Sequence, residues 1–434
     1  MTFHPLVFIL ALLHAFIGWR LAPELAAPWA WVLGVSLVLS TCLMPLGLMG
    51  SRAFRQPWAD RLSWAGLLLM GLFSTAFVLT ALRDVGLLLA WGVDATGLVT
   101  MPLDVLRRFS AQGVPLLALA VTFSGFLNAR RTPAIVRVDV PIAGLPAALH
   151  GFTLAQISDV HVGPTIKHAY LARIVARVNT LGADVVAITG DLVDGKVAEL
   201  AAHVAPLTSL RSTHGTFFVT GNHEYYSGAH AWVIELRRLG LTVLMNEHVV
   251  LHHGRLLGSD TNFAAVQRTA PSRGANGSAN LGSDPKNLAQ DDSQTVAALV
   301  LAGVTDYTAH HFDPSHRSDP ALALLGAPAS ALIRILLAHQ PRSAQAAHDA
   351  GFDLQLSGHT HGGQFWPWNL FVPMQQPFTA GLNKLHSLWV YTSRGTGYWG
   401  RQSALVRHLK SRLCGWWQLE GGAALLLFLV SNCL

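Results

Sequence analysis

The feature that most restricts the fold of this chain is a set of four long stretches without Asp, Glu, Lys or Arg. They cover residues 1–19, 25–51, 62–82 and 109–129. Each stretch approaches or exceeds the roughly 20 residues that a helix needs to cross the hydrocarbon core of a bilayer. Charged residues form only 12% of the chain, about half of their share in an average soluble domain. We therefore predict a transmembrane region of about four helices within residues 1–130.

The orientation of these helices depends on the apolar segment 85–103, which Asp94 interrupts. We expect this segment to extend a helix or to lie at the membrane interface. Four spans then place the rest of the chain on the side that holds five arginines, Arg52, Arg55, Arg61, Arg130 and Arg131. The other side holds four, Arg20, Arg83, Arg107 and Arg108. Basic residues favour the cytoplasmic side, so the rest of the chain is predicted to be cytoplasmic. A span at 85–103 would invert this orientation.

The net charge of +6 raises the question of a nucleic-acid partner. The Lys and Arg residues are scattered, and several flank the apolar stretches, where membrane topology explains them. We therefore expect no nucleic-acid binding. The three cysteines, Cys42, Cys414 and Cys433, have no spacing typical of a metal site or a redox pair.

Beyond residue 150 the long apolar stretches give way to short apolar segments separated by polar loops, and residues 131–150 are interpreted as a linker. Seven segments have the length and composition of buried strands: 152–157, 184–189, 216–220, 297–302, 333–338, 354–356 and 388–392. Residues 169–181 carry apolar side chains at helical spacing. This alternation predicts a layered α/β domain over residues 151–400. The polar segment 259–294 predicts a flexible surface insertion.

Polar side chains follow five of the predicted strands at their carboxyl ends. They are carboxylates, imidazoles and one amide: Asp159, His161, Asp191, Asp194, Asn222, His223, Glu224, His339, His359 and His361. In open α/β sheets, ligands bind beyond the carboxyl ends of the strands. The five clusters can therefore meet in one crevice.

Each cluster alone has an ordinary structural explanation. Asp159 beside His161 can be a buried hydrogen-bonded pair, and the segment 190–194 can be a turn with a capping carboxylate. His359 and His361 can be a structural pair, although the glycines around them permit close approach to a ligand. All five clusters in order, each at the end of a strand, favour one shared site.

The residue types in these clusters suit a pair of divalent cations. Carboxylate, imidazole and amide ligands bind Mn, Fe, Zn or Mg, and no thiolate is involved. A bridging carboxylate can hold two cations about 3.5–4 Å apart, and a water shared between them becomes a nucleophile near neutral pH. The cations also neutralise the oxygens of a phosphate group. The sequence thus predicts a dinuclear hydrolase of phosphate esters.

The order of these motifs resembles that of the calcineurin-like metallophosphoesterase superfamily. The residues 362–364 and 393–397 are similar to its membrane-associated bacterial phosphodiesterase branch. The resemblance implies a four-layer sandwich of two β-sheets flanked by helices, in a multi-pass protein of the bacterial inner membrane. It also implies a phosphodiester substrate. Because the predicted helices would anchor the chain in a membrane, we expect this substrate to be membrane-proximal or a lipid.

The resemblance further implies a role for each motif residue. One metal would be held by Asp159, His161, Asp191 and His361, and the other by Asp191, Asn222, His339 and His359. Asp191 would bridge the two metals. Asn222 and His223 would contact the substrate, and His223 would protonate the leaving oxygen or stabilise the transition state.

Three further residues have two interpretations each. Asp194 is predicted to assist catalysis by orienting His223 or a metal ligand, with a loop cap as the alternative. Glu224 is a second candidate for such a role. Arg394 is predicted to bind a substrate phosphate, with an ion pair to a nearby carboxylate as the alternative.

The chain departs from the family pattern after Gly400, where a final strand would be expected to close the sheet. Residues 401–434 instead contain a basic stretch and an apolar end at 423–430, which is too short to span a membrane. A shifted reading frame or a divergent tail would explain the difference.

Two other functions compete with phosphodiester hydrolysis. Phosphomonoester hydrolysis would use the same ligands. A membrane scaffold that has lost catalysis is also conceivable, although the intact set of candidate ligands argues against it. Transport through the helices has little support, because their apolar stretches carry almost no ionisable residues.

Overall fold

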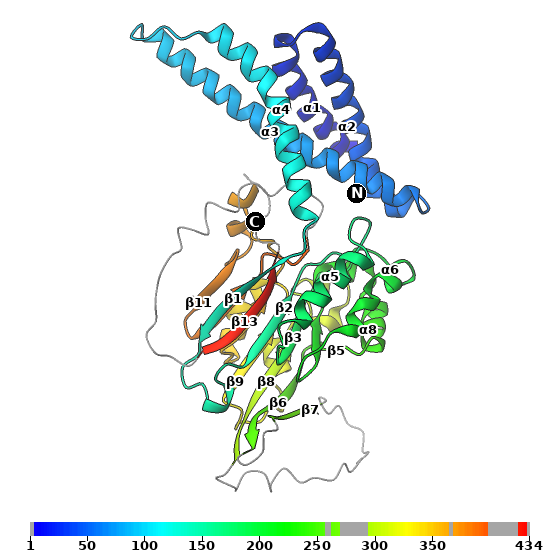
Figure 1. Cartoon of the computed structure of the whole chain (residues 1–434), viewed down its shortest axis with the longest axis vertical. Coiled ribbons are helices and arrows are strands. Elements are labelled where there is room, and N and C mark those ends of the chain that lie inside the picture. Colours follow the sequence, from blue (N-terminus) through cyan, green and yellow to red (C-terminus); the bar gives the residue numbers. More distant parts are fainter. Residues whose placement is uncertain (1–3, 257–261, 270–293, 364–367, 398–423, 432–434) are drawn as a thin grey trace. The chain divides into compact units, whose positions relative to one another are not determined.

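The computed structural model describes residues 4–256, 262–269, 294–363, 368–397 and 424–431. Within these residues the chain forms two compact units, a helical unit up to Arg131 and a second unit that begins at Thr132 (Figure 1). Every strand among the described residues belongs to the second unit.

The helical unit confirms the prediction of four apolar helices. Its elements are α1 (His4–Leu21), α2 (Ala27–Ala53), α3 (Trp58–Ala95) and α4 (Leu103–Ala129). All four are long and apolar enough to cross a membrane. The segment 85–103, for which an extension or an interfacial segment was expected, continues α3 as far as Ala95.

Charged side chains inside the helical unit pair with one another. Arg20 of α1 donates to Asp84 of α3, with Nε and Oδ2 2.7 Å apart. The buried guanidinium of Arg83 also bonds to Asp84, and it donates to the Ser110 hydroxyl and the Arg107 carbonyl oxygen of α4. Because an unpaired charge is costly in an apolar environment, this network ties α1, α3 and α4 together.

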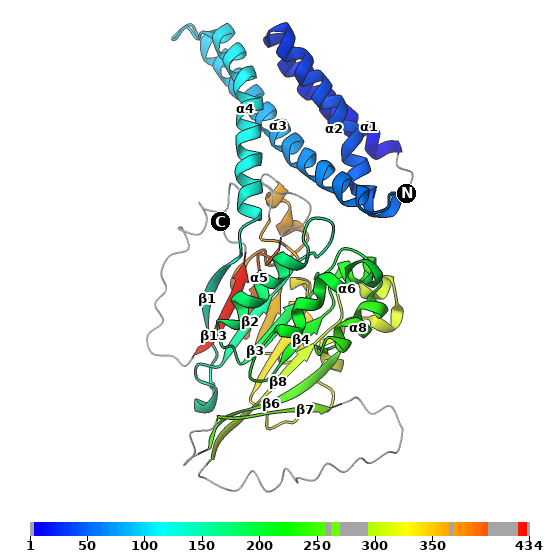
Figure 2. The same ribbon diagram turned by 45° about the vertical axis from the view of Figure 1, so that its right-hand side comes forward.

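The second unit contains two sheets (Figure 2). The first has the strand order β1-β13-β2-β3-β4-β5 and consists of β1 (Ala134–Pro141), β2 (Thr153–Ile157), β3 (Val185–Thr189), β4 (Thr216–Val219), β5 (Thr242–Val243) and β13 (Ala424–Ser431). The second has the order β11-β12-β10-β9-β8-β6-β7 and consists of β6 (Glu247–Leu256), β7 (Asn262–Thr269), β8 (Gln294–Gly303), β9 (Ile333–Leu337), β10 (Leu354–Ser357), β11 (Gly381–Leu385) and β12 (Leu388–Thr392).

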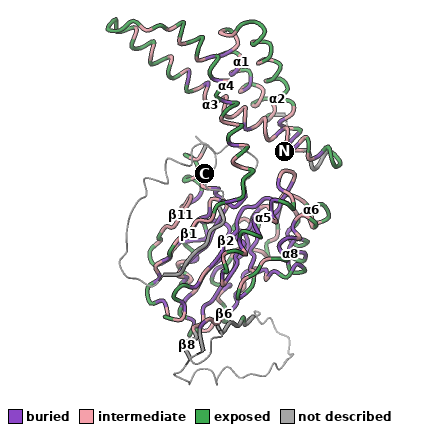
Figure 3. Tube along the Cα trace, viewed as in Figure 1, coloured by how far each residue is buried: buried purple, intermediate pink, exposed green. Residues whose placement is uncertain are grey.

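The core of this unit lies between the two sheets. Leu154, Val185 and Phe217 of the first sheet join Leu299 and Ile335 of the second in one buried cluster, and buried residues run along the strands of both sheets in Figure 3. Burial on both faces explains why β3 and β4 consist almost entirely of apolar residues.

Helices cover the outer faces of both sheets. α5 (His168–Asn179), α6 (Val197–Val204) and α8 (Ala229–Arg238) lie against the first sheet (Figures 1 and 2). On the second sheet, Ala323 of α9 (Pro320–Ala323) and Ala347 of α10 (Ala344–Asp349) pack in a separate buried cluster with Leu336. The short α7 (Asn222–Ser227) follows β4. The predicted sandwich of two helix-flanked sheets is confirmed.

Three segments differ from the sequence prediction. Residues 131–150, predicted as a linker, contain β1, and the tail 401–434 contains β13. β13 pairs antiparallel with β1 and parallel with β2, in the register Leu426↔Asp139 and Leu426↔Thr153. The apolar end of the tail is therefore the strand that completes the first sheet. Neither strand was predicted, because each depends on a partner almost 300 residues away.

The predicted insertion 259–294 is also partly ordered into a strand. β7 lies within it and pairs antiparallel with β6 at the edge of the second sheet, with Val266 opposite Leu251. Gln294 begins β8. Residues 270–293 lie outside the described part of the chain. A polar composition predicted a loop here, but backbone pairing with β6 does not require apolar side chains.

The packing of α2 on α3 depends on two glycines at their crossing. A Cβ added at Gly66 would lie 2.6 Å from the Gly47 Cα and 3.0 Å from the Leu43 carbonyl oxygen. A Cβ at Gly47 would meet Gly66 equally closely. Small residues allow such close backbone approach between apolar helices.

We predict that Gly66→Ala separates α2 from α3 and destabilises the helical unit by about 1–3 kcal/mol, the usual cost of overpacking. The measurement is thermal unfolding of the detergent-solubilised protein, followed by helical circular dichroism. Gly86→Ala in the same helix is the matched control, because its added Cβ meets no atom within 4 Å. Equal unfolding temperatures for the two variants would contradict the prediction.

Candidate metal centre

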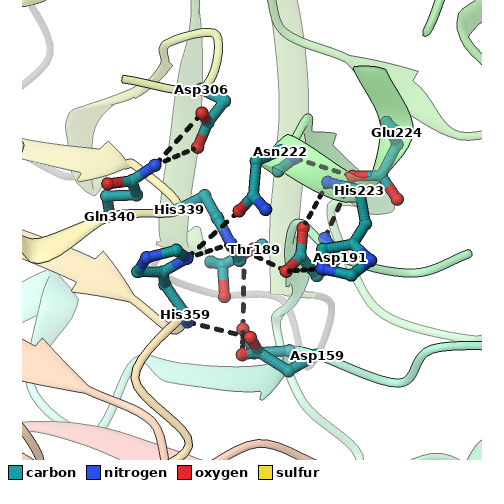
Figure 4. A network of polar contacts seen from close by, with 12 residues as sticks. Asp159, Thr189, Asp191, Asn222, His223, Glu224, Asp306, His339, Gln340 and His359 are labelled. Atoms are coloured by element: carbon teal, nitrogen blue, oxygen red, sulfur yellow. Dashed lines mark hydrogen bonds and ion pairs between the residues drawn. The ribbon is translucent and has the colours of Figure 1, made fainter. Parts of the chain in front are cut away.

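The five predicted clusters meet at the carboxyl ends of the parallel strands (Figure 4). Asp159 and His161 follow β2, and Asp191 and Asp194 follow β3. Asn222 and His223 begin α7 after β4. His339 follows β9, and His359 and His361 follow β10. Strands of both sheets thus contribute to one site, whose side chains are mostly buried.

Five of the candidate ligands have left-handed backbone conformations. The φ angles are 55° for Asp159, 56° for His161, 51° for Asp191, 71° for His359 and 49° for His361. Residues other than glycine rarely adopt such φ angles. Strained backbone conformations are common at functional sites. The sharp reversals after the strands turn these side chains toward a common centre.

The first group of candidate ligands consists of Asp159, His161 and His361, whose ligand atoms all lie within 4.8 Å of one another. The Nε2 atoms of the two imidazoles are 3.1 Å apart, and His361 Nε2 is 3.5 Å from Asp159 Oδ1. Asp159 is oriented by the Ser158 hydroxyl, which donates to Oδ2, and by the His359 backbone N–H, which donates to Oδ1.

The second group consists of Asp191, His339 and His359, together with Asn222. His359 Nδ1 lies 3.3 Å from His339 Nε2 and 3.1 Å from Asn222 Oδ1. The Nδ1–H of His339 donates to the Thr189 carbonyl oxygen at 2.8 Å. This bond leaves Nε2 to face the site, the usual arrangement of a metal-binding imidazole.

Asp191 lies between the two groups. Its Oδ2 atom is 3.2 Å from His339 Nε2 in the second group and 3.9 Å from His161 Nε2 in the first. Its Oδ1 atom accepts the backbone N–H of His223. One carboxylate therefore faces imidazoles of both groups, and the bridging role of Asp191 stays a prediction.

Asp194 holds two imidazoles through one oxygen. Oδ1 accepts Nδ1–H of His223 at 2.6 Å and Nδ1–H of His161 at 3.0 Å. Burial opposes a charged His223, but the carboxylates of Asp191 and Asp194 outweigh it and raise its pKa to about 9. Asp194 thus orients a candidate ligand and a candidate proton donor together.

Glu224 fixes the loop that carries Asp191. Its buried carboxylate accepts backbone N–H groups from Gly221 at 2.7 Å, Asp191 at 3.0 Å, Leu192 at 2.8 Å and Val193 at 3.2 Å. Burial and the nearby Asp191 raise the pKa of Glu224 to about 7, while these N–H donors favour the ionised form. The sequence indicated Glu224 only through its place in the motif after β4.

Two glycines allow the loops to approach this closely. A Cβ at Gly221 would collide with Asp191 Oδ1, and a Cβ at Gly358 would collide with the Ser158 hydroxyl and Asp159 Oδ2. Both glycines precede a cluster of candidate ligands. Their role in the motifs is therefore to leave room for the two central carboxylates.

The remaining predicted residues lie around this centre. Arg394 is half-buried beside the 358–363 loop, with its Cγ 2.8 Å from a Cβ built at Gly362, and its binding of phosphate stays a prediction. Gln364 lies outside the described residues. Ser158 and Thr189, which orient Asp159 and His339, were not among the predicted residues, since a lone hydroxyl or carbonyl at a strand end carries no sequence signal.

The donor set fits two divalent cations. Burial and the positive charge expected on His339 lower the pKa of His359 to about 3, so this imidazole is neutral and able to act as a ligand. Burial opposes a charged His339, yet Asp191 and Asp159 raise its pKa well above the ordinary value. A cation would take the place of that proton, because metal ligands bind in their deprotonated forms.

The two-sheet α/β sandwich carries groups of Asp and His at its strand ends that could hold metal ions. The family model of the calcineurin-like phosphoesterases matches residues 152–363. The chain is 33% identical over 298 residues to an uncharacterized metallophosphoesterase of Helicobacter pylori, covering 68% of this chain and 67% of the relative. This chain belongs to the calcineurin-like phosphoesterase family.

Three further relatives are two transmembrane proteins with a metallophosphoesterase domain and one pyrophosphatase. A transmembrane protein with metallophosphoesterase domain from Bos taurus is 36% identical over 333 residues, 74% of this chain and 66% of the relative. The chain spans 58% of the corresponding protein of Danio rerio, and thus less than two thirds of either protein. The UDP-2,3-diacylglucosamine pyrophosphatase LpxG of Chlamydia trachomatis is 26% identical over 292 residues, 62% of this chain and 86% of the relative.

We predict that Glu224→Gln destabilises the second unit by roughly 2–4 kcal/mol, because the NH2 group of glutamine would face two backbone N–H groups from which it cannot accept a hydrogen bond. Bound metal should fall as the Asp191 loop loosens. Thermal unfolding and metal analysis of the purified protein test both effects. Glu199→Gln on the exposed surface of α6 is the control. Unchanged stability and metal content in Glu224→Gln would contradict this role.

Proposed function

We propose that this chain hydrolyses phosphate esters at the cluster around Asp191. The observation that carries the proposal is the position of the Asp191 carboxylate, which faces imidazoles of two separate ligand groups. Asp159, His161, Asp191 and His361 would hold one divalent cation, and Asp191, Asn222, His339 and His359 the other. The pair would neutralise the phosphate oxygens and lower the pKa of a shared water.

The proposed role of His223 is to donate a proton to the leaving oxygen. Its Nδ1–H is held by Asp194, and its Nε2 lies 3.9 Å from Asp191 Oδ2 at the candidate metal centre. The raised pKa of His223 keeps a proton on the ring. The same two carboxylates that raise the pKa also keep the imidazole in place.

We further propose a phosphate that carries an organic group on each side, such as a phosphodiester. The rings of Tyr226 and Phe312 are 57% and 51% exposed, and Tyr226 makes an edge contact with His223 at 5.2 Å between ring centroids. Such an aromatic surface beside the proton donor can contact an organic leaving group. The relationship to a pyrophosphatase of a diacylated sugar nucleotide supports a lipid substrate.

The proposed location is the bacterial inner membrane, with the catalytic unit in the cytoplasm. The four apolar helices and the name of the Bos taurus relative support a membrane protein. The distribution of arginines around the helices supports the cytoplasmic side.

We predict that Asp191→Asn loses both bound metal and hydrolysis, with activity below about one hundredth of the wild-type value, because an amide cannot bridge two cations as a carboxylate does. Metal analysis and turnover of bis-aryl phosphate with added manganese are the measurements. Asp349→Asn on the exposed surface of α10 is the control. Unchanged metal content in Asp191→Asn would favour a scaffold, and faster turnover of mono-aryl phosphate by the wild type would favour a phosphomonoesterase.

We predict that His223→Asn retains its metal but loses activity in a way that depends on the leaving group. Alkyl leaving groups need a proton, so their hydrolysis should fall by about 10²–10⁴-fold. A nitrophenyl ester should be affected far less, since nitrophenolate leaves unprotonated. The measurement is kcat for a series of esters with different leaving groups. His168→Asn, at an exposed position of α5, is the control. An equal loss for all esters would assign His223 to electrostatic stabilisation alone.

A further inference from the structure

A second group of potential ligands lies outside the centre described above. It consists of His230 in the first turn of α8, together with Asp313 and His316 at the short 3-10 helix Pro314–His316. One ligand atom from each residue lies within 4.8 Å of the other two. Asp313 Oδ2 is 3.1 Å from His230 Nε2 and 3.9 Å from His316 Nε2.

One oxygen of the Asp313 carboxylate accepts hydrogen bonds from Ser315, and the other faces the two imidazoles. Oδ1 accepts the backbone N–H of Ser315 at 2.9 Å and its hydroxyl at 2.6 Å. Oδ2 faces His230 and His316. Two imidazoles therefore lie around one carboxylate oxygen.

His316 is held so that one ring nitrogen remains for a ligand. Its Nδ1 is 3.0 Å from the Tyr225 hydroxyl, and its Nε2 is on the Asp313 side. Its backbone is anchored by the Thr305 hydroxyl, which donates to the His316 carbonyl oxygen at 2.7 Å. A hydrogen bond to the second nitrogen is the common support of a metal-binding imidazole.

We propose that His230, Asp313 and His316 bind a third divalent cation of the zinc class. Two imidazole nitrogens and one carboxylate oxygen are ligands that zinc prefers, and three protein ligands leave the fourth position for water. The His230 side chain is 74% exposed, so this position is accessible to solvent. The site does not depend on hydrolysis at the Asp191 cluster.

A cation at this site would connect three segments near the proposed substrate surface. It joins α8 to residues 313–316 directly and reaches α7 through the Tyr225–His316 hydrogen bond. Phe312, next to Asp313, contacts both Tyr225 and Tyr226 of α7. The cation would therefore stabilise the helix that carries Asn222 and His223.

The test is equilibrium dialysis of the full-length, detergent-solubilised protein against buffered free zinc, with bound zinc counted by elemental analysis. Wild type should bind one equivalent more than His230→Ala, because the Asp191 cluster is the same in both proteins. Tyr225→Phe should weaken the additional site by about 10–100-fold, as expected for loss of a group that supports a ligand. His311→Ala, an exposed histidine of the same segment, is the matched control.

Each outcome bears on the third site separately from the hydrolase. A deficit of one equivalent in His230→Ala and in Asp313→Asn, with the full count in His311→Ala, supports the site even if no ester is hydrolysed. Equal zinc counts in wild type and His230→Ala would overturn it. A similar loss in His230→Ala and His311→Ala would also overturn it, since that pattern indicates unspecific binding by surface histidines.

Discussion

The rest of the candidate centre depends on the contacts of the Asp191 carboxylate. Its Oδ2 atom faces His339 on one side and His161 on the other, so the two ligand groups share it. A buried carboxylate in this position must itself be held, and Glu224 does so by accepting four backbone N–H groups from the surrounding loops. The charge density of these carboxylates is high for a buried region, and divalent cations would balance it.

The two units of the chain accommodate polar groups in different ways. In the helical unit, Arg20 and Arg83 both pair with Asp84. In the second unit, polar side chains gather where parallel strands end, and left-handed residues turn them inward. These strained backbone conformations persist because the strands before the turns are fixed in the buried core between the two sheets.

The sequence predicted the central strands and the candidate ligands because both have local signals. The strands of the core, such as β3, are buried on both faces and therefore read as continuous apolar runs. The ligands follow those runs directly, with glycines where the backbone must turn. Glu224 illustrates the limit of such reasoning. Its place in a motif was visible, but its four bonds to separate loops depend on how those loops meet.

By itself, the sequence determined the four apolar helices, the layered α/β domain and the set of candidate ligands, since hydrophobic pattern and residue type act over a few neighbouring positions. The sandwich of two sheets followed from the resemblance to a known family. Only the tertiary structure decided that β13 lies between β1 and β2, that β7 lies at the edge of the second sheet, and that His230 meets Asp313 and His316. The position of β13 and the meeting of His230 with Asp313 join segments far apart in the chain, whereas β7 pairs with its neighbour in the sequence, β6. Pairing between distant segments is decided by packing and backbone hydrogen bonds, which leave no pattern in either segment alone.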